Sequence, residues 1–107
     1  WDGFVESGQG MGATLVMADQ MHGYVLADRG TYLKFKDKMR LKPLGRTSES
    51  LRNPYGAIVV KPNEEAAGQL ETANAFVDFL ISREAQMLIR NYKLHGEQLF
   101  HPSRLEE

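Results

Sequence analysis

Cysteine is missing from all 107 residues, which excludes disulfides, thiolate zinc sites and cysteine nucleophiles. Long apolar runs are missing too, since no stretch reaches the roughly 18 residues that a membrane-spanning helix needs. The chain also lacks an excess of positive charge: its formal net charge is −1, so nucleic acid is not expected as a partner. With 42% hydrophobic and 25% charged residues, the composition fits one ordinary globular domain.

A secretion leader is not visible at the start of the chain. The sequence begins at Trp1, and no basic segment followed by an apolar one precedes it. We therefore expect an excised segment or a processed product. The lack of cysteine fits either the cytoplasm or a bacterial periplasm.

Catalytic signatures are absent as well. His22, His95 and His101 do not have the spacing of metal ligands, and no serine lies in a G-x-S-x-G motif. No carboxylate pair is singled out by its surroundings, and no Gly-Lys-Ser/Thr follows the glycines as a P-loop would require. We expect a protein that is not an enzyme and holds no metal or cofactor.

The sequence does contain a glycine-rich loop, ESGQGMGATL. Gly8, Gly10 and Gly12 free the backbone to expose successive N–H groups, and the helix expected next adds unpaired donors at its N-terminus. Ser7 or Thr14 can add a hydroxyl donor. This pattern predicts an anion-binding site, and a turn built only for tight packing is the alternative that it leaves open.

A dinucleotide-binding loop is a more remote interpretation of the same glycines. The G-x-G-x-x-G fingerprint needs a buried strand before it and an acidic residue about 20 residues later. Asp28 is suitably placed for that acid, but the third glycine comes one residue early. The preceding WDGFVE is also too short and polar for the strand. A dinucleotide-binding enzyme therefore remains a distant alternative.

Arginine follows Asp28 at the end of a short apolar segment. At the carboxyl end of a strand and the start of a helix, Arg29 is well placed to donate two hydrogen bonds to an oxyanion. Taken alone, however, these residues favour an Asp28–Arg29 pair on the surface, which contributes about 0–1 kcal/mol.

The spacing of apolar residues predicts alternating strands and helices. Helices are expected over 13–22, 31–38, 73–80 and 82–92, and strands over 24–27, 55–60 and 94–100. Thr31, Thr72 and Ser82 are the expected N-caps, and Gly23 is the expected left-handed end of the first helix. The segment 39–44 is expected to be an edge strand or irregular, and 45–54 a polar crossover. The fold class is α/β or α+β, ending in a helix pair.

Four collinear blocks resemble one family. ESGQGMGATLVMADQMHGYVLADRGTYL is similar to the glycine loop, helix and Asp-Arg segment of tungstate-binding proteins, the solute receptors of tungstate ABC transporters. NPYGAIVVKP, ANAFVDFLISREAQMLI and GEQLFHP resemble later segments of the same family. The similarity runs from residue 1 to about residue 102.

This resemblance implies an α/β periplasmic-binding-protein fold of type II, in which two lobes close on an oxyanion. Residues 1–46 would belong to the second lobe, 47–54 to the hinge crossover and 55–107 to the carboxyl-terminal part of the first lobe. The location would be periplasmic or otherwise extracytoplasmic, and the partner a membrane permease. Members of the family bind tungstate, and some also bind molybdate. The implied ligand set is Ser7, Gly8, Gln9, Gly10, Met11, Gly12 and Arg29.

The choice among oxyanions depends on protonation. Tungstate, molybdate and sulfate are fully deprotonated near neutral pH and suit a site made of donors alone. Phosphate keeps a proton and rewards an acceptor carboxylate. An Asp28 side chain that points into the cleft therefore favours phosphate, and one that pairs elsewhere favours the tungstate-like dianions.

The chain also departs from the family pattern. The family's N-terminal portion, with a hydroxyl-rich loop and another cleft arginine, is not in this sequence, and Ser7 stands where threonine is common. We therefore expect part of a site, and uncovered apolar surface on the last helices that favours a homodimer. The alternative function is the oxyanion-sensing effector domain of a transcriptional regulator.

Overall fold

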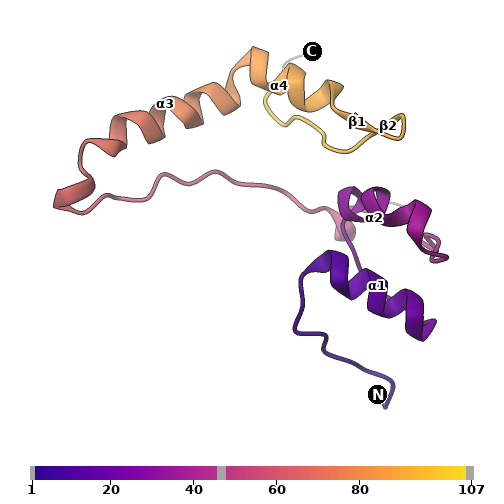
Figure 1. Cartoon of the computed structure of the whole chain (residues 1–107). Coiled ribbons are helices and arrows are strands. Elements are labelled where there is room, and N and C mark those ends of the chain that lie inside the picture. Colours follow the sequence, from indigo (N-terminus) through magenta and orange to yellow (C-terminus); the bar gives the residue numbers. More distant parts are fainter. Residues whose placement is uncertain (1, 46–47, 106–107) are drawn as a thin grey trace. The chain divides into compact units, whose positions relative to one another are not determined.

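The computed structural model describes residues 2–45 and 48–105. The chain divides into two compact units, Trp1–Asn53 and Pro54–Glu107, which are described separately below. Each is built mainly from helices (Figure 1). The expected alternation of strands and helices is not found among the described residues, where the one sheet is a small hairpin near the carboxyl end.

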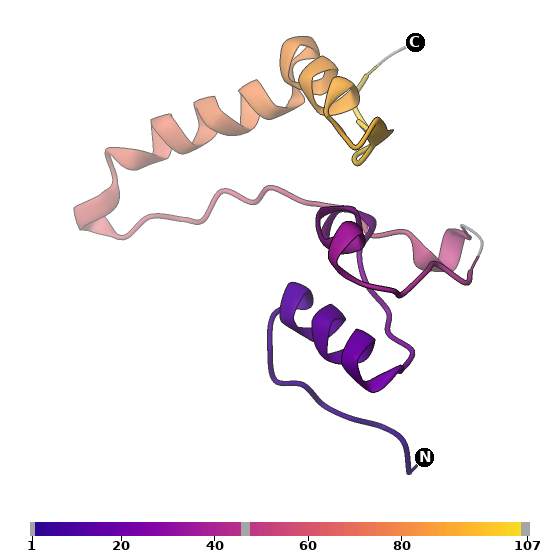
Figure 2. The ribbon, with the colours of Figure 1, turned by 45° about the vertical axis from the view of Figure 1, so that its right-hand side comes forward.

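The amino-terminal unit is centred on two helices, α1 (Met11–Met21) and α2 (Arg29–Phe35), which pack against each other (Figures 1 and 2). Two short 3₁₀ turns follow, η1 (Lys36–Lys38) and η2 (Glu49–Leu51). The core between the helices contains Leu15 and Leu33, each only 2% exposed.

The first helix confirms the helix expected over 13–22, but it ends differently. His22, with φ of 53°, is the left-handed residue at its C-terminus, and Gly23 is not. The N–H groups of His22 and Gly23 donate to the carbonyls of Asp19 and Ala18, at 3.3 and 2.8 Å. The prediction for Gly23 is therefore wrong by one residue, because the carbonyls of the last turn are already satisfied when the chain leaves His22.

The cap of α2 is Asp28 and not Thr31. One carboxylate oxygen of Asp28 accepts the Thr31 N–H at 2.8 Å, and the Thr31 hydroxyl donates to the other oxygen at 2.8 Å. The hydrogen bond from the Thr31 N–H, assisted by the hydroxyl, lowers the pKa of Asp28. Both carboxylate oxygens of Asp28 are thus engaged in capping the N-terminus of α2.

Replacing Asp28 with alanine should lower the free energy of unfolding by about 1 kcal/mol at pH 7, the usual loss for an N-cap. Because the pKa of Asp28 is lowered in the folded state, the stabilisation is present above the unfolded pKa of about 4 and is lost as the pH falls through the folded pKa. Urea unfolding of the full-length protein between pH 7 and 2.5 measures this. The free energies of unfolding of the unmodified protein and of Asp28→Ala should converge as the pH falls. Asp28→Asn, which also caps, is the control. A deficit for alanine that is the same at every pH would contradict this account.

The carboxyl-terminal unit contains η3 (Glu64–Ala66), α3 (Gln69–Ile81) and α4 (Arg83–Asn91). The sequence suggested Thr72 as the cap of the long helix. This prediction is wrong, because α3 begins after Gly68 and Thr72 lies inside it. Ser82 does cap α4, as expected: its hydroxyl accepts the Ala85 N–H at 3.3 Å.

A short hairpin replaces the single strand expected over 94–100. Strand β1 (Lys93–Leu94) pairs antiparallel with β2 (Glu97–Gln98). His95 and Gly96 form the connection with positive φ values of 51° and 77°. Two consecutive left-handed residues are what a tight two-residue hairpin turn requires.

The buried polar residue of this unit is Gln86, only 6% exposed. Its Nε2 donates to the Leu80 carbonyl at 2.7 Å, and its Oε1 accepts the Arg104 N–H at 2.9 Å. Leu80 lies in the last turn of α3, where carbonyls have no partner inside the helix. The amide of Gln86 therefore ties the chain after the hairpin to the junction of α3 and α4.

The strands expected over 24–27 and 55–60 are not formed among residues 2–45 and 48–105. Both segments are irregular by hydrogen bonding, as is 39–44. A strand is stable only when neighbouring strands satisfy its backbone groups, so β-branched composition cannot create one alone. Ile58 and Val60 remain 87% and 79% exposed.

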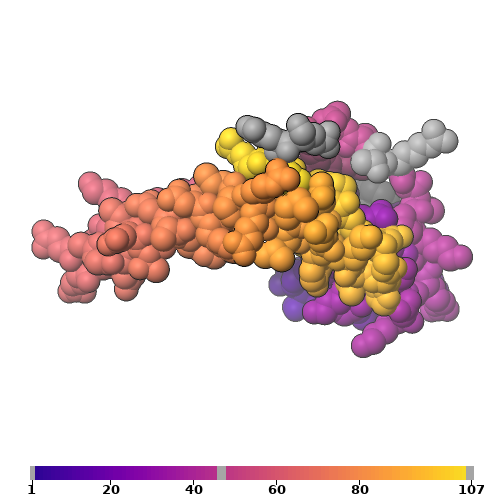
Figure 3. Space-filling view, turned by 90° about the horizontal axis from the view of Figure 1, so that it is seen from above, coloured from indigo at the N-terminus to yellow at the C-terminus, as the bar shows by residue number. Residues whose placement is uncertain are grey.

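The helices of this unit also carry exposed apolar side chains. Figure 3 shows the surface of these helices in orange. Phe76 is 60% exposed, Ile81 52% and Leu88 61%. Exposed apolar area on this scale marks a surface that is suited to being covered.

Candidate anion-binding site

The glycine loop is shaped by one left-handed glycine and one hydroxyl pair. Gly8 has φ of +61°, a conformation that disfavours other residues. The next N–H, that of Gln9, donates to Ser7 Oγ at 3.2 Å. Ser7 Oγ lies 2.6 Å from Thr14 Oγ1, so a hydroxyl of α1 holds the serine against the helix.

The protons of this pair have two arrangements. Thr14 can donate to Ser7, or it can donate to the Gln9 carbonyl 3.4 Å away while Ser7 donates to Thr14. Only the first arrangement leaves the Ser7 proton for a ligand. The Thr14 N–H is already bonded to the Gly10 carbonyl at 3.0 Å. The Thr14 hydroxyl can therefore turn its proton toward either Ser7 Oγ or the Gln9 carbonyl. The sequence suggested Thr14 as a direct donor, and the structure gives it a second role beside Ser7.

The start of α1 supplies backbone donors. Gly10 is the N-cap, and as a glycine it offers no side chain to the first-turn N–H groups of Met11 and Gly12. These groups have no acceptor within the helix, and the helix dipole gives them partial positive charge. Gly8, Gln9, Gly10 and Met11 are exposed, and Ser7 and Gly12 are half-buried. Backbone donors beside a hydroxyl suit a small anion chemically.

Gly12 also has a packing role. A side chain at this position would come within 2.9 Å of Cε2 and Cζ of Phe35, at the last residue of α2. The packing interpretation therefore holds for Gly12 whatever the loop binds. Phe35 was not singled out from the sequence, because nothing in the spacing shows which aromatic residue meets which glycine.

Arg29 is the first residue of α2 and is exposed. Phe35 lies at the other end of this helix, six residues or about 9 Å along the axis. The contact with Gly12 is therefore made by the C-terminal end of α2, next to Lys34 and Lys36, and Arg29 lies at the opposite end.

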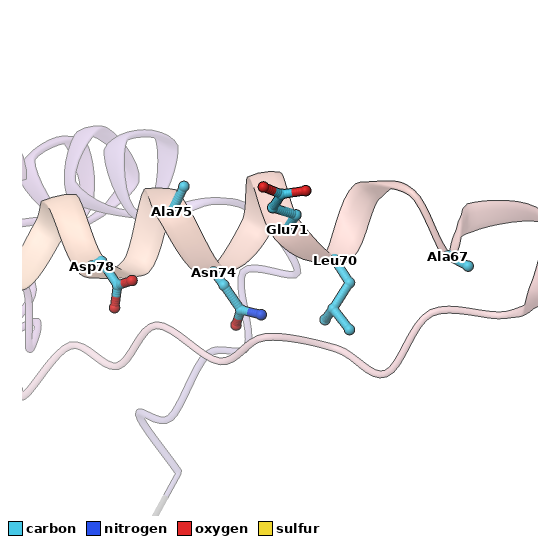
Figure 4. Close-up of a pocket in the computed structure, with 6 residues that line it drawn as sticks. All are labelled: Ala67, Leu70, Glu71, Asn74, Ala75 and Asp78. Carbon is cyan, nitrogen blue, oxygen red and sulfur yellow. The ribbon is translucent and has the colours of Figure 1, made fainter.

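Other kinds of site find no support in the described structure. No group of three or more His, Cys, Asp or Glu residues is arranged to hold a metal ion within 2–45 and 48–105. The helices described there include none long and apolar enough to cross a bilayer. One hollow lies along α3, but its lining diverges: Leu70, Asn74 and Asp78 point to one side of the helix and Glu71 to the other (Figure 4). Such a surface does not enclose a ligand.

Comparison with known proteins identifies the class. The model of the PBP superfamily domain matches residues 2–84, and the chain belongs to this superfamily. It is 44% identical over 107 residues to a protein of Haloferax volcanii described as an ABC transporter anion-binding protein. It is 40% identical over 104 residues to the tungstate-binding protein TupA of Peptoclostridium acidaminophilum, and 31% over 101 residues to TupA of Campylobacter jejuni. The resemblance seen in the sequence is thus confirmed.

The extent of these matches is uneven. They cover 95%, 95% and 91% of this chain but 31%, 36% and 38% of the respective relatives. The chain therefore spans about a third of the length of the curated relatives that it matches. No solved structure matches it.

Proposed function

We propose that this chain is part of the solute-binding component of an ABC transporter and that it helps to bind a tetrahedral oxyanion, tungstate first and molybdate second. The observation that carries this proposal is its similarity, across nearly all of its length, to relatives named for tungstate or anion binding. Such a component binds without catalysis, outside the cytoplasm, and delivers its ligand to a permease.

Within this proposal, the loop is one wall of the binding cleft. Backbone N–H groups of Gly8, Gly10, Met11 and Gly12, the Ser7 hydroxyl and Arg29 are the donors. The Gln9 N–H joins them when it exchanges its bond to Ser7 Oγ for one to the ligand. Residues 1–46 belong to one lobe, 47–54 to the hinge and 55–107 to the other lobe of an α/β fold. The division into units between Asn53 and Pro54 is compatible with a hinge in this segment.

The state of Asp28 supports a fully deprotonated ligand. Its carboxylate accepts from both the N–H and the hydroxyl of Thr31, and its pKa is lowered. A carboxylate engaged in this way is poorly available to accept the proton of phosphate. A site of donors alone favours tungstate, molybdate or sulfate.

The exposed apolar side chains bear on assembly. If this chain exists alone, we propose that α3 and the segment around Ile58 associate with a second copy, because their apolar area is large. The oxyanion-sensing domain of a regulator remains the second candidate function. Fusion to a DNA-binding module in the full-length gene product would favour it.

Calorimetry on the full-length protein tests the proposal. Tungstate should bind with one site per protein, and phosphate should bind at least tenfold more weakly. Ser7→Ala should weaken tungstate binding about tenfold, the usual loss for a hydrogen bond to a charged group. Ser103→Ala, at an exposed serine of the other unit, is the matched control. Tight phosphate binding without tungstate binding would refute the assignment.

A further inference from the structure

A run of cationic residues follows α2. Five lysines and arginines fall within nine residues, and Asp37 is the one acidic residue among them. All except Lys36 are exposed. We call this set the basic tract: Lys34, Lys36, Lys38, Arg40 and Lys42.

Two contacts place the basic tract along α1. Phe35, inside the tract, meets Gly12 in the first turn of α1. Further on, Asp19 Oδ1 accepts the N–H groups of Arg40 and Leu41 at 2.7 and 3.1 Å. Gly12 and Asp19 are about 10 Å apart along the helix. The tract therefore starts beside the glycine loop and follows α1 toward its C-terminal end.

The charges near this path do not cancel. Asp28 and Arg29, at the start of α2, have opposite charges that cancel in this count. The other acidic groups on the adjoining chain are Glu6, before the loop, Asp19 and Asp37. Five cations against these three carboxylates leave an excess of two positive charges, in a chain whose net charge is −1. The Debye length is about 10 Å at 0.1 M salt, so this excess acts on an anion that approaches the loop.

We propose that the basic tract guides the oxyanion to the glycine loop during encounter without touching it once it is bound. This inference rests on the proposed function. Charges beside a site raise the association rate constant and make it depend on salt, whereas groups that touch the ligand change the dissociation rate constant.

The test compares two triple variants of the full-length protein by stopped-flow fluorescence with tungstate. Lys36→Gln, Lys38→Gln and Lys42→Gln together neutralise part of the tract. The control carries Lys61→Gln, Arg90→Gln and Lys93→Gln, which removes the same charge from exposed positions of the other unit. At low ionic strength the tract variant should associate about 3- to 10-fold more slowly, with a dissociation rate constant within about twofold of the unmodified protein. At about 0.5 M salt all three proteins should associate alike.

The outcomes separate this inference from the function beneath it. An unchanged association rate constant, or an equal slowing in the control, overturns the guiding role and leaves tungstate binding intact. Faster dissociation at an unchanged association rate makes the lysines ligand contacts and also overturns it. If the unmodified protein binds neither tungstate nor molybdate in calorimetry, the proposed function fails and this inference fails with it.

Discussion

Gly12→Val should lower the free energy of unfolding of the full-length protein by about 2 kcal/mol, because the new side chain enters the space of the Phe35 ring. Alanine is a weaker probe. Its gain in helix propensity of about 1 kcal/mol offsets part of the clash, and the ring can turn away from a single methyl group. Valine adds branched bulk, so the ring must move further than it does for a single methyl group. Urea unfolding measures the difference.

A substitution at the neighbouring position separates the clash with Phe35 from the effect of valine on helix stability. Ala13→Val places the same residue at an exposed position of the same turn and should cost well under 1 kcal/mol. Phe35→Ala should restore part of the stability lost in Gly12→Val, with a coupling of at least about 1 kcal/mol. Strictly additive effects would show that the two residues do not compete for space. Tungstate affinity should follow the same pattern, since the ring fixes the start of α1 where the proposed donors lie.

Gln86→Leu should lower the free energy of unfolding by about 1–3 kcal/mol, the largest loss expected from a side chain in the carboxyl-terminal unit. Leucine fills a similar volume but leaves both the Leu80 carbonyl and the Arg104 N–H without the partner that Gln86 supplies. The Leu80 carbonyl carries most of this loss, since an unsatisfied buried group costs about 1–3 kcal/mol. Arg104 is exposed, so water can bond its N–H. The measurement is urea unfolding of the full-length protein.

The control for Gln86 is Gln20→Ala in α1, at an exposed position, where the change should be within about 0.5 kcal/mol. Amide hydrogen exchange adds an independent reading: the Arg104 N–H should lose protection in Gln86→Leu. Retained protection and a loss below 1 kcal/mol would mean that the amide bridge contributes little.

Local patterns were sufficient for helices and insufficient for their exact ends. The periodicity of α1, α3 and α4 was correct because each helix satisfies its own backbone. Ser82 was recognised as a cap since no better candidate lies beside it. Thr31 is not the cap because α2 begins earlier, at Arg29, and the Asp28 carboxylate accepts the Thr31 N–H.

The pairing of strands and the contacts between distant residues could not be predicted from the sequence. The segment 55–60 has the composition of a buried strand, yet a strand depends on neighbours that the segment does not specify. The candidate site shows the same division. The loop and its hydroxyl were visible as a pattern, and the meeting of Gly12 with Phe35, like the alignment of the basic tract with α1, arises only when distant segments pack.

Ser82 performs two tasks with one oxygen atom. Its hydroxyl donates to the Phe79 carbonyl at 2.6 Å, closing α3, and accepts the Ala85 N–H at 3.3 Å, opening α4. An aspartate at this position can accept but cannot donate, and only a hydroxyl meets both demands with a single atom. The joint therefore has no spare length. An inserted residue would prevent one hydroxyl from making both hydrogen bonds. The angle between α3 and α4 would then no longer be fixed by Ser82 and could change between homologues.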